Sequence, residues 1–138
     1  MAATSSTPQL FAPGEALQDG SALNAALAAG IIGGVAAGQI ALGTNLATAF
    51  PLLQTITEFT TVAAGTGAAL RALQPGQQQI VFNQGGGQTL TVYPNSTAYT
   101  IDAGAAGAGV SLSNNNRCTY LCVAPGVIIS AQLGAASS

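Results

Sequence analysis

The chain has almost no charged side chains. Only 4% of its 138 residues are charged, whereas a soluble globular domain has about 25%. It contains no lysine, histidine or tryptophan, and 5% of its residues are aromatic. Because surface charge keeps free-standing proteins soluble and monomeric, we expect this chain to place much of its surface against a membrane, a fibre or a larger protein assembly.

The missing residue types exclude several functions. Arg71 and Arg117 are the only cationic side chains, so the basic stripe that nucleic-acid binding requires is absent. Without histidine, a serine or cysteine nucleophile lacks its usual base. Glu58 and Asp102 are conceivable as a glycosidase-type carboxylate pair, but no tryptophan is present to stack on a sugar. The sequence predicts no enzyme, no catalytic residue, no cofactor and no nucleic-acid partner.

The two cysteines lie in the segment Arg117-Cys-Thr-Tyr-Leu-Cys122. On a β-strand they face the same side at a separation of roughly 13 Å, which exceeds the reach of a disulfide, about 7 Å between Cα atoms. We therefore predict two buried free thiols that pack as small hydrophobic groups. A metal-binding cysteine pair is the alternative, but neither a histidine nor a third cysteine is present to complete the site.

Residues 1–50 are predicted to form an N-terminal arm with attachment or oligomer contacts. Its beginning lacks the basic and apolar regions of a secretory signal, so we expect synthesis in the cytoplasm. Prolines and glycines interrupt residues 1–21, where Leu10 and Phe11 form an isolated apolar anchor.

Residues 22–42 are an uncharged, Ala/Gly-rich run. Its aliphatic residues recur at four-residue steps and would share one face of a helix: Leu23, Leu27, Ile31 and Val35. The run has the length of a membrane span, but it lacks flanking basic or aromatic anchors. We predict instead a short helix near residues 21–29, followed by a glycine-rich connection.

From about Thr55 the residue pattern changes to β. Short runs of β-branched and aromatic residues are separated by Gly, Asn and Pro turns. They predict strands at 56–62, 78–83, 88–93, 98–102, 109–113, 117–123 and 127–133. The runs 78–83 and 88–93 flank three glycines and predict a β-hairpin. Residues 51–138 are therefore predicted to form a small antiparallel β-sandwich or barrel.

A β-domain of this size has a thin hydrophobic core. No disulfide or metal is predicted to reinforce it, and no lysine protects its edge strands from pairing. Oligomerisation is the remaining way to stabilise such a domain. We therefore expect a closed homo-oligomer.

Several segments together resemble a group of small structural proteins of tailed bacteriophages. They include Ala41-Leu-Gly-Thr-Asn-Leu-Ala-Thr-Ala-Phe-Pro-Leu52, Gln74-Pro-Gly-Gln-Gln-Gln-Ile-Val-Phe-Asn83, Leu90-Thr-Val-Tyr-Pro94 and the run from Glu58 to Leu70. The resemblance covers roughly residues 40–123. The chain departs from the pattern at Asp102-Ala103, where Asn-Gly is usual, and at Val127-Ile-Ile129, where an aromatic residue is often found.

The resemblance implies a component of the virion, and three functional hypotheses follow. The first is a trimeric capsid decoration (cement) protein that stabilises the head shell and contacts the major capsid protein or other virion proteins. The second is a tail or head fibre component, and the third is a small protein inserted in a membrane through residues 22–42. The predicted assembly contacts are Leu10, Phe11, Leu23, Leu27, Ile31, Val35, Arg71 and Arg117.

Overall fold

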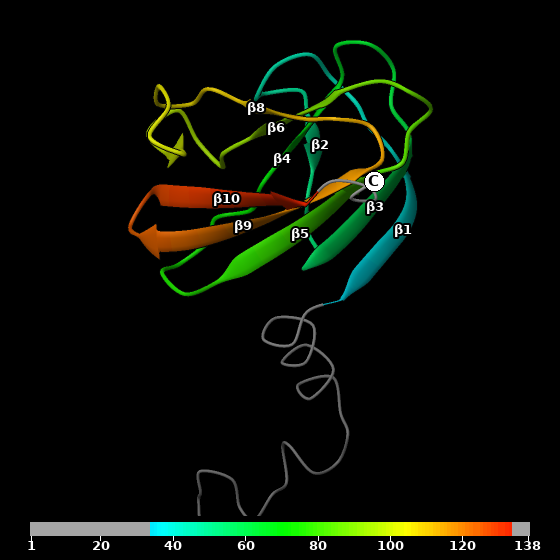
Figure 1. Ribbon diagram of the computed structural model, residues 1–138. Helices are drawn as coiled ribbons and strands as arrows, with labels where there is room; N and C mark the ends of the chain where they lie inside the picture. The colour runs from blue at the N-terminus through cyan, green and yellow to red at the C-terminus, as the bar shows by residue number, and fades with distance from the viewer. Residues whose placement is uncertain (1–33, 134–138) are drawn as a thin grey trace, which may run out of the picture. The chain divides into compact units, whose positions relative to one another are not determined.

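The computed structural model describes residues 34–133. Over this range the chain is mainly β, with ten strands and no helix (Figure 1). The strands are β1 (Val35–Ile40), β2 (Phe50–Pro51), β3 (Ile56–Thr61), β4 (Gly67–Ala69), β5 (Gln78–Asn83), β6 (Leu90–Tyr93), β7 (Thr100–Ile101), β8 (Val110–Leu112), β9 (Asn116–Ala124) and β10 (Val127–Leu133). All seven strands predicted from the sequence are present, with ends that differ by a few residues.

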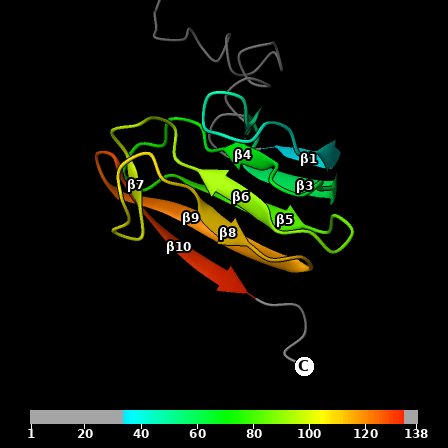
Figure 2. The same ribbon diagram turned by 90° about the horizontal axis from the view of Figure 1, so that it is seen from above.

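The strands form two sheets that lie one above the other. The first sheet has six strands in the order β1-β3-β5-β9-β10-β7, and the second has four in the order β2-β4-β6-β8. Figure 1 shows the two sheets as separate layers, and Figure 2 shows β4, β6 and β8 lying over the larger sheet.

The first six strands wind back and forth between the two sheets. Strands β1, β3 and β5 pair in parallel in the larger sheet, and β2, β4 and β6 pair in parallel in the smaller one. From β3 to β6, each strand therefore pairs with the strand two positions earlier in the chain. Ile80 of β5, for example, pairs with Ile56 of β3. This is the winding of a β-solenoid.

The last strands reverse the direction of pairing. Strand β8 is antiparallel to β6, β9 is antiparallel to β5, and β10 is antiparallel to β9, while β7 runs parallel to β10. The predicted antiparallel sandwich or barrel is therefore wrong for the first six strands, which pair in parallel. Antiparallel pairing is found only between β6 and β8, β5 and β9, and β9 and β10.

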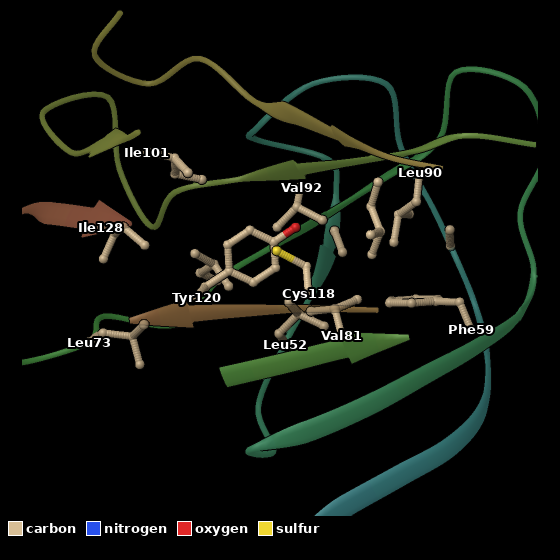
Figure 3. Packing of buried hydrophobic residues seen from close by; sticks show 14 of the residues in the cluster. Leu52, Phe59, Leu73, Val81, Leu90, Val92, Ile101, Cys118, Tyr120 and Ile128 are labelled. Atoms are coloured by element: carbon tan, nitrogen blue, oxygen red, sulfur yellow. The ribbon is translucent and has the colours of Figure 1, made fainter. Parts of the chain in front are cut away.

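The hydrophobic core lies between the two sheets. From the larger sheet, Phe59, Val81 and Tyr120 are almost completely buried, and from the smaller sheet Leu90 and Val92 are as well. Figure 3 shows Tyr120 and Cys118 of β9 pointing toward Val92 of β6. Phe50 of β2 meets Phe59 edge to face, with ring centroids 5.3 Å apart, so even the short strand β2 is fixed by aromatic packing.

Two buried amide side chains of β5 hold the connections between the sheets. Gln79 donates from Nε2 to the carbonyl oxygens of Leu52 (3.0 Å) and Gln54 (2.9 Å), and its Oε1 accepts from the amide of Arg71 (2.9 Å). The same side chain thus satisfies backbone groups of two different loops. Each buried polar group that is left without a partner would destabilise the fold by about 1–3 kcal/mol.

Asn83 also binds backbone groups of the connections, at the other end of β5. Its contacts explain why the predicted hairpin is wrong. Its Nδ2 donates to the carbonyl oxygens of Gln88 (2.8 Å) and Leu112 (2.9 Å), and its Oδ1 accepts from the amide of Gly85 (3.0 Å). A Cβ atom on Gly85 would lie 2.4 Å from Cγ2 of Val62. The glycine turn therefore packs on the previous coil and carries the chain from the larger sheet into the smaller one, so β5 and β6 do not pair.

The β structure begins before the predicted boundary at residue 51. Strand β1 occupies residues 35–40 and pairs with β3, which excludes a continuous helix over 22–42. Val35 therefore lies on a strand and not on a helical stripe. The predicted helix near 21–29, and the predicted contacts Leu10, Phe11, Leu23, Leu27 and Ile31, lie outside the described residues.

Candidate functional site

The outer face of the six-stranded sheet is largely apolar. Along β3, β5 and β9 every second side chain enters the core, and the side chains between them point away from it. Many of these outward side chains are also hydrophobic. We call this surface the apolar face and define it by Val35, Ile56, Ile80, Phe82, Leu121, Val123, Ile129 and Leu133.

The strand register arranges these side chains in rows across the sheet. In one row Val35 pairs with Ile56, Ile56 with Ile80, and Ile80 with Thr119. The most exposed side chains of the face are Val35 at 66%, Leu133 at 53% and Val123 at 48%. Three neighbouring aliphatic side chains on the outside of a sheet are typical of a surface that another protein covers.

A second row contains the only two charged side chains of this face. Glu58 pairs with Phe82, Phe82 with Arg117, and Arg117 with Leu133. Two strand spacings separate Glu58 from Arg117, roughly 10 Å. Oε2 of Glu58 accepts a long hydrogen bond of 3.4 Å from the amide of Gly38, while Arg117 is exposed. Within residues 34–133, these two opposite charges thus flank an aromatic ring without contacting each other.

The outer face of the four-stranded sheet has a different composition. Gly67, Thr91 and Ser111 occupy one row across β4, β6 and β8. The ring of Tyr93 covers the positions where Gly67 and Gly109 lack a side chain, since a Cβ atom on either would lie within 2.9 Å of ring atoms. The Tyr93 hydroxyl donates to the carbonyl oxygen of Thr44 (3.2 Å). This face is partly polar, and the Tyr93 ring covers its glycine positions, whereas Ser111 is exposed.

The structure places the two predicted arginine contacts at opposite ends of β5. Arg117 lies beside Phe82 on the apolar face. Arg71 follows β4 in a loop, where Nη1 donates to the carbonyl oxygen of Leu53 (3.4 Å) and the backbone amide donates to Gln79. The two arginines therefore do not form one site.

The conceivable carboxylate pair is not assembled. Glu58 lies on β3, and Asp102 follows β7 at the far side of the sheet, with β5, β9 and β10 between them. Four strand spacings amount to roughly 19 Å, whereas glycosidase carboxylates lie about 5–9.5 Å apart. Asp102 instead accepts hydrogen bonds from the amide (2.7 Å) and the hydroxyl of Ser130, so its carboxylate fastens the turn after β7 to β10.

The cysteines are free and buried, which confirms the sequence prediction. Burial raises the pKa of the Cys118 thiol, although hydrogen bonding to Tyr120 and Ser130 acts in the opposite direction. Burial also raises the pKa of the Tyr120 hydroxyl, with the charge of Cys118 adding to the effect. Both groups stay protonated at neutral pH, and a protonated, enclosed thiol is a poor nucleophile.

Neither a metal centre nor a membrane helix is found among the described residues. Residues 34–133 contain no group of three or more His, Cys, Asp or Glu side chains that could hold a metal ion. In the same range no helix has the length and hydrophobicity needed to cross a bilayer.

Sequence reasoning missed most of the apolar face. The predicted contacts include Val35 and Arg117, but not the aliphatic and aromatic residues between them. A signal was present: Ile80-Val-Phe82 and Val127-Ile-Ile129 are consecutive apolar runs, and such runs indicate strands whose two faces are both covered.

Comparison with known proteins found no match, either to a family model, to a curated protein or to a solved structure.

Proposed function

We propose that this chain is a structural protein of the virion of a tailed bacteriophage, a capsid decoration (cement) protein that oligomerises on the head shell and stabilises it. Its partners are further copies of itself, as a trimer, and the major capsid protein or another virion protein. The described β region supplies the packed body of the subunit, and the N-terminal residues supply attachment to the shell.

The apolar face is the observation that carries this proposal. A monomeric protein rarely exposes a contiguous apolar surface unless the surface binds something. Here the surface covers several strands of one sheet, and a chain with 4% charged residues has little else to keep it soluble alone. An assembly component needs such a surface, whereas a free enzyme does not.

The remaining geometry agrees with a structural role. The only titratable groups in the core, Cys118, Cys122 and Tyr120, are enclosed by hydrophobic side chains. The two carboxylates of residues 34–133 are far apart, and one of them holds a turn. The resemblance to phage structural proteins, which covers the same β region, then selects a virion over other assemblies.

A fibre component is the second candidate, because parallel coils are the architecture that extended solenoid proteins use. One experiment separates the two. Particles are purified from the lysate in which this chain is produced and are labelled with gold-conjugated antibodies against it. We expect label over the whole head. Label restricted to the tail or to one vertex would replace the decoration protein by a fibre, and particles without label would overturn a virion role.

Deletion of residues 1–21 tests the attachment function of the N-terminal residues. We expect the truncated chain to keep its oligomeric state and to lose binding to empty capsids of the same particle, measured by co-sedimentation. Undiminished co-sedimentation of the truncated chain would contradict this assignment.

A further inference from the structure

We infer that the apolar face is the surface through which copies of this chain associate. In this contact Glu58 of one copy pairs with Arg117 of the next, beside Phe82. The inference deepens the proposed function, because it names the surface and the partner of the oligomer. It is tested on the purified chain without capsids, so its failure is distinguishable from the failure of a virion role.

The first argument is the hydrophobicity of both sides of the sheet. Strand β5 carries Val81 toward the core and Ile80 and Phe82 away from it. An open sheet that faces water on one side normally alternates apolar and polar side chains. From Ile80 to Phe82 this alternation is absent, which supports an interface on the outer side of the sheet.

The second argument is charge complementarity, which identifies the occupant. The face presents one carboxylate and one guanidinium, placed on either side of Phe82 in the same row. A second copy brings the opposite charge for each of them. Residues 1–33, the other candidate to cover the face, contain no lysine or arginine and cannot supply a cationic side chain to Glu58.

The third argument is symmetry. Glu58 and Arg117 lie at the same height along the strands and on opposite sides of Phe82. A rotation axis parallel to the strands therefore brings Glu58 of one copy to Arg117 of another, and the reverse pair forms at the same time in a dimer or around the ring in a trimer. Closed symmetry of this kind is the rule for homo-oligomers.

The size of the face is sufficient for such an interface. Five strands of about six residues cover an area on the order of 500 Å². Two copies then bury about 1,000 Å² in total, the lower bound for a specific interface. Phe82 lies near the end of β5, which is the middle one of these five strands, and aromatic side chains are enriched among the residues that contribute most to binding.

The experiment measures the mass of the full-length chain by light scattering after gel filtration, over a range of concentrations. We expect an oligomer for the unmodified chain. Phe82→Asp should weaken association about 100-fold or more, since it removes an aromatic side chain from the contact and buries an unpaired charge there. Glu58→Arg and Arg117→Glu should each weaken it about tenfold, because each places like charges opposite one another.

The double variant Glu58→Arg with Arg117→Glu is the decisive sample. It restores opposite charges across the contact and should recover association to within about threefold of the unmodified chain. Ser111→Arg, on the outer face of the other sheet, is the matched control and should leave the mass unchanged. Circular dichroism spectra check that each variant keeps its β structure.

Three results would overturn the inference. One is a monomeric unmodified chain, which would show that copies of this chain do not associate through the apolar face. Another is an oligomer that Phe82→Asp leaves intact. The third is a double variant that associates no better than the single reversals, because the two charges would then not meet between copies.

Discussion

On the outer face of the six-stranded sheet, Ile80 and Phe82 stand among other apolar side chains, whereas on the outer face of the four-stranded sheet the ring of Tyr93 lies over Gly67 and Gly109. Both faces point away from the core, but only on the four-stranded sheet does a side chain of the same chain, Tyr93, cover the backbone at the glycines. The Tyr93 ring covers the backbone at the two glycines, and its hydroxyl donates a hydrogen bond to the carbonyl oxygen of Thr44. The first face has no comparable cover within residues 34–133.

This difference separates two ways of stabilising a thin two-layer β protein. The smaller sheet is completed inside the subunit, through a glycine–aromatic contact that any added side chain would disturb. The larger sheet is left incomplete and, in our proposal, is completed by other copies. Substitutions around Gly67 and Tyr93 on the smaller sheet should therefore change the stability of the subunit, and substitutions on the apolar face of the larger sheet should change its assembly.

The largest effect is expected where the two sheets are joined. Gln79→Leu removes the side chain that binds Leu52, Gln54 and Arg71 and leaves buried backbone groups without partners. We expect the free energy of unfolding to fall by about 3 kcal/mol, measured by urea denaturation. The neighbouring Gln78 is exposed, so Gln78→Leu serves as the control. An equal loss in both variants would show that Gln79 does not hold the loops.

The second effect tests the self-covered face directly. A Cβ atom on Gly67 would lie 2.7 Å from the carbonyl oxygen of Thr91 and 2.8 Å from the Tyr93 ring. Gly67→Val should therefore destabilise the subunit by about 2 kcal/mol through overpacking. Ser111→Val, on the same sheet face but exposed, should change the unfolding free energy by less than about 0.5 kcal/mol. An unfolding free energy that Gly67→Val leaves unchanged would show that the packing of Tyr93 does not require a glycine at position 67.

A third effect concerns the core that the two sheets share. Burial raises the pKa of Cys118 from its ordinary value of 9.0 and the pKa of Tyr120 from its ordinary value of 10.0. The unfolded chain therefore releases these protons at lower pH than the folded chain does. Stability from both groups is complete below about pH 9 and is lost as pH rises through 9 and 10.

Urea unfolding midpoints measured between neutral pH and the alkaline range check this dependence. Tyr120→Phe should make the decline with pH shallower, because it removes the hydroxyl and keeps the ring. The native chain should also react slowly with a thiol reagent at neutral pH and should react at both cysteines after unfolding. Rapid labelling of the native chain would contradict the enclosure of Cys118 and Cys122.

The smallest effect on the subunit is expected on the apolar face. Leu133→Lys replaces a side chain that is 53% exposed at its margin. The unfolding free energy of the subunit, measured at a concentration where it is monomeric, should change by less than about 0.5 kcal/mol. Solubility at high concentration should rise, because the charge interrupts an apolar surface. A large loss of stability would show that this margin belongs to the core.

The strands themselves were predictable, and their partners were not. Residues 78–83 and 127–133 form strands at the positions that β-branched and aromatic residues indicate, because this pattern depends on neighbouring residues only. Pairing depends on residues far apart in the chain, such as Ile56 with Ile80. The prediction that strands adjacent in sequence pair with each other failed at β5 and β6, where three glycines mark a crossing between sheets and not a hairpin turn.

The candidate site was predictable only in part for the same reason. Arg117 and Val35 were named as contacts, but for reasons of charge and helical spacing, and Val35 proved to lie on β1. Arg71 was placed with them although it lies in a loop after β4. Strands β1, β2 and β4 were missed. Strands β1 and β4 consist largely of alanine and glycine, which carry little β-propensity, and β2 has only two residues.

The sequence by itself determined the β class of the region from about Thr55 to Leu133, the free buried thiols, and a chain in which only 4% of residues are charged. These properties follow from composition and local alternation. Only the tertiary structure decided which surface is left uncovered. Parallel pairing places Ile56 beside Ile80, and antiparallel pairing places Phe82 beside Arg117. No local pattern records these neighbours, because they come from strands that are distant in the chain.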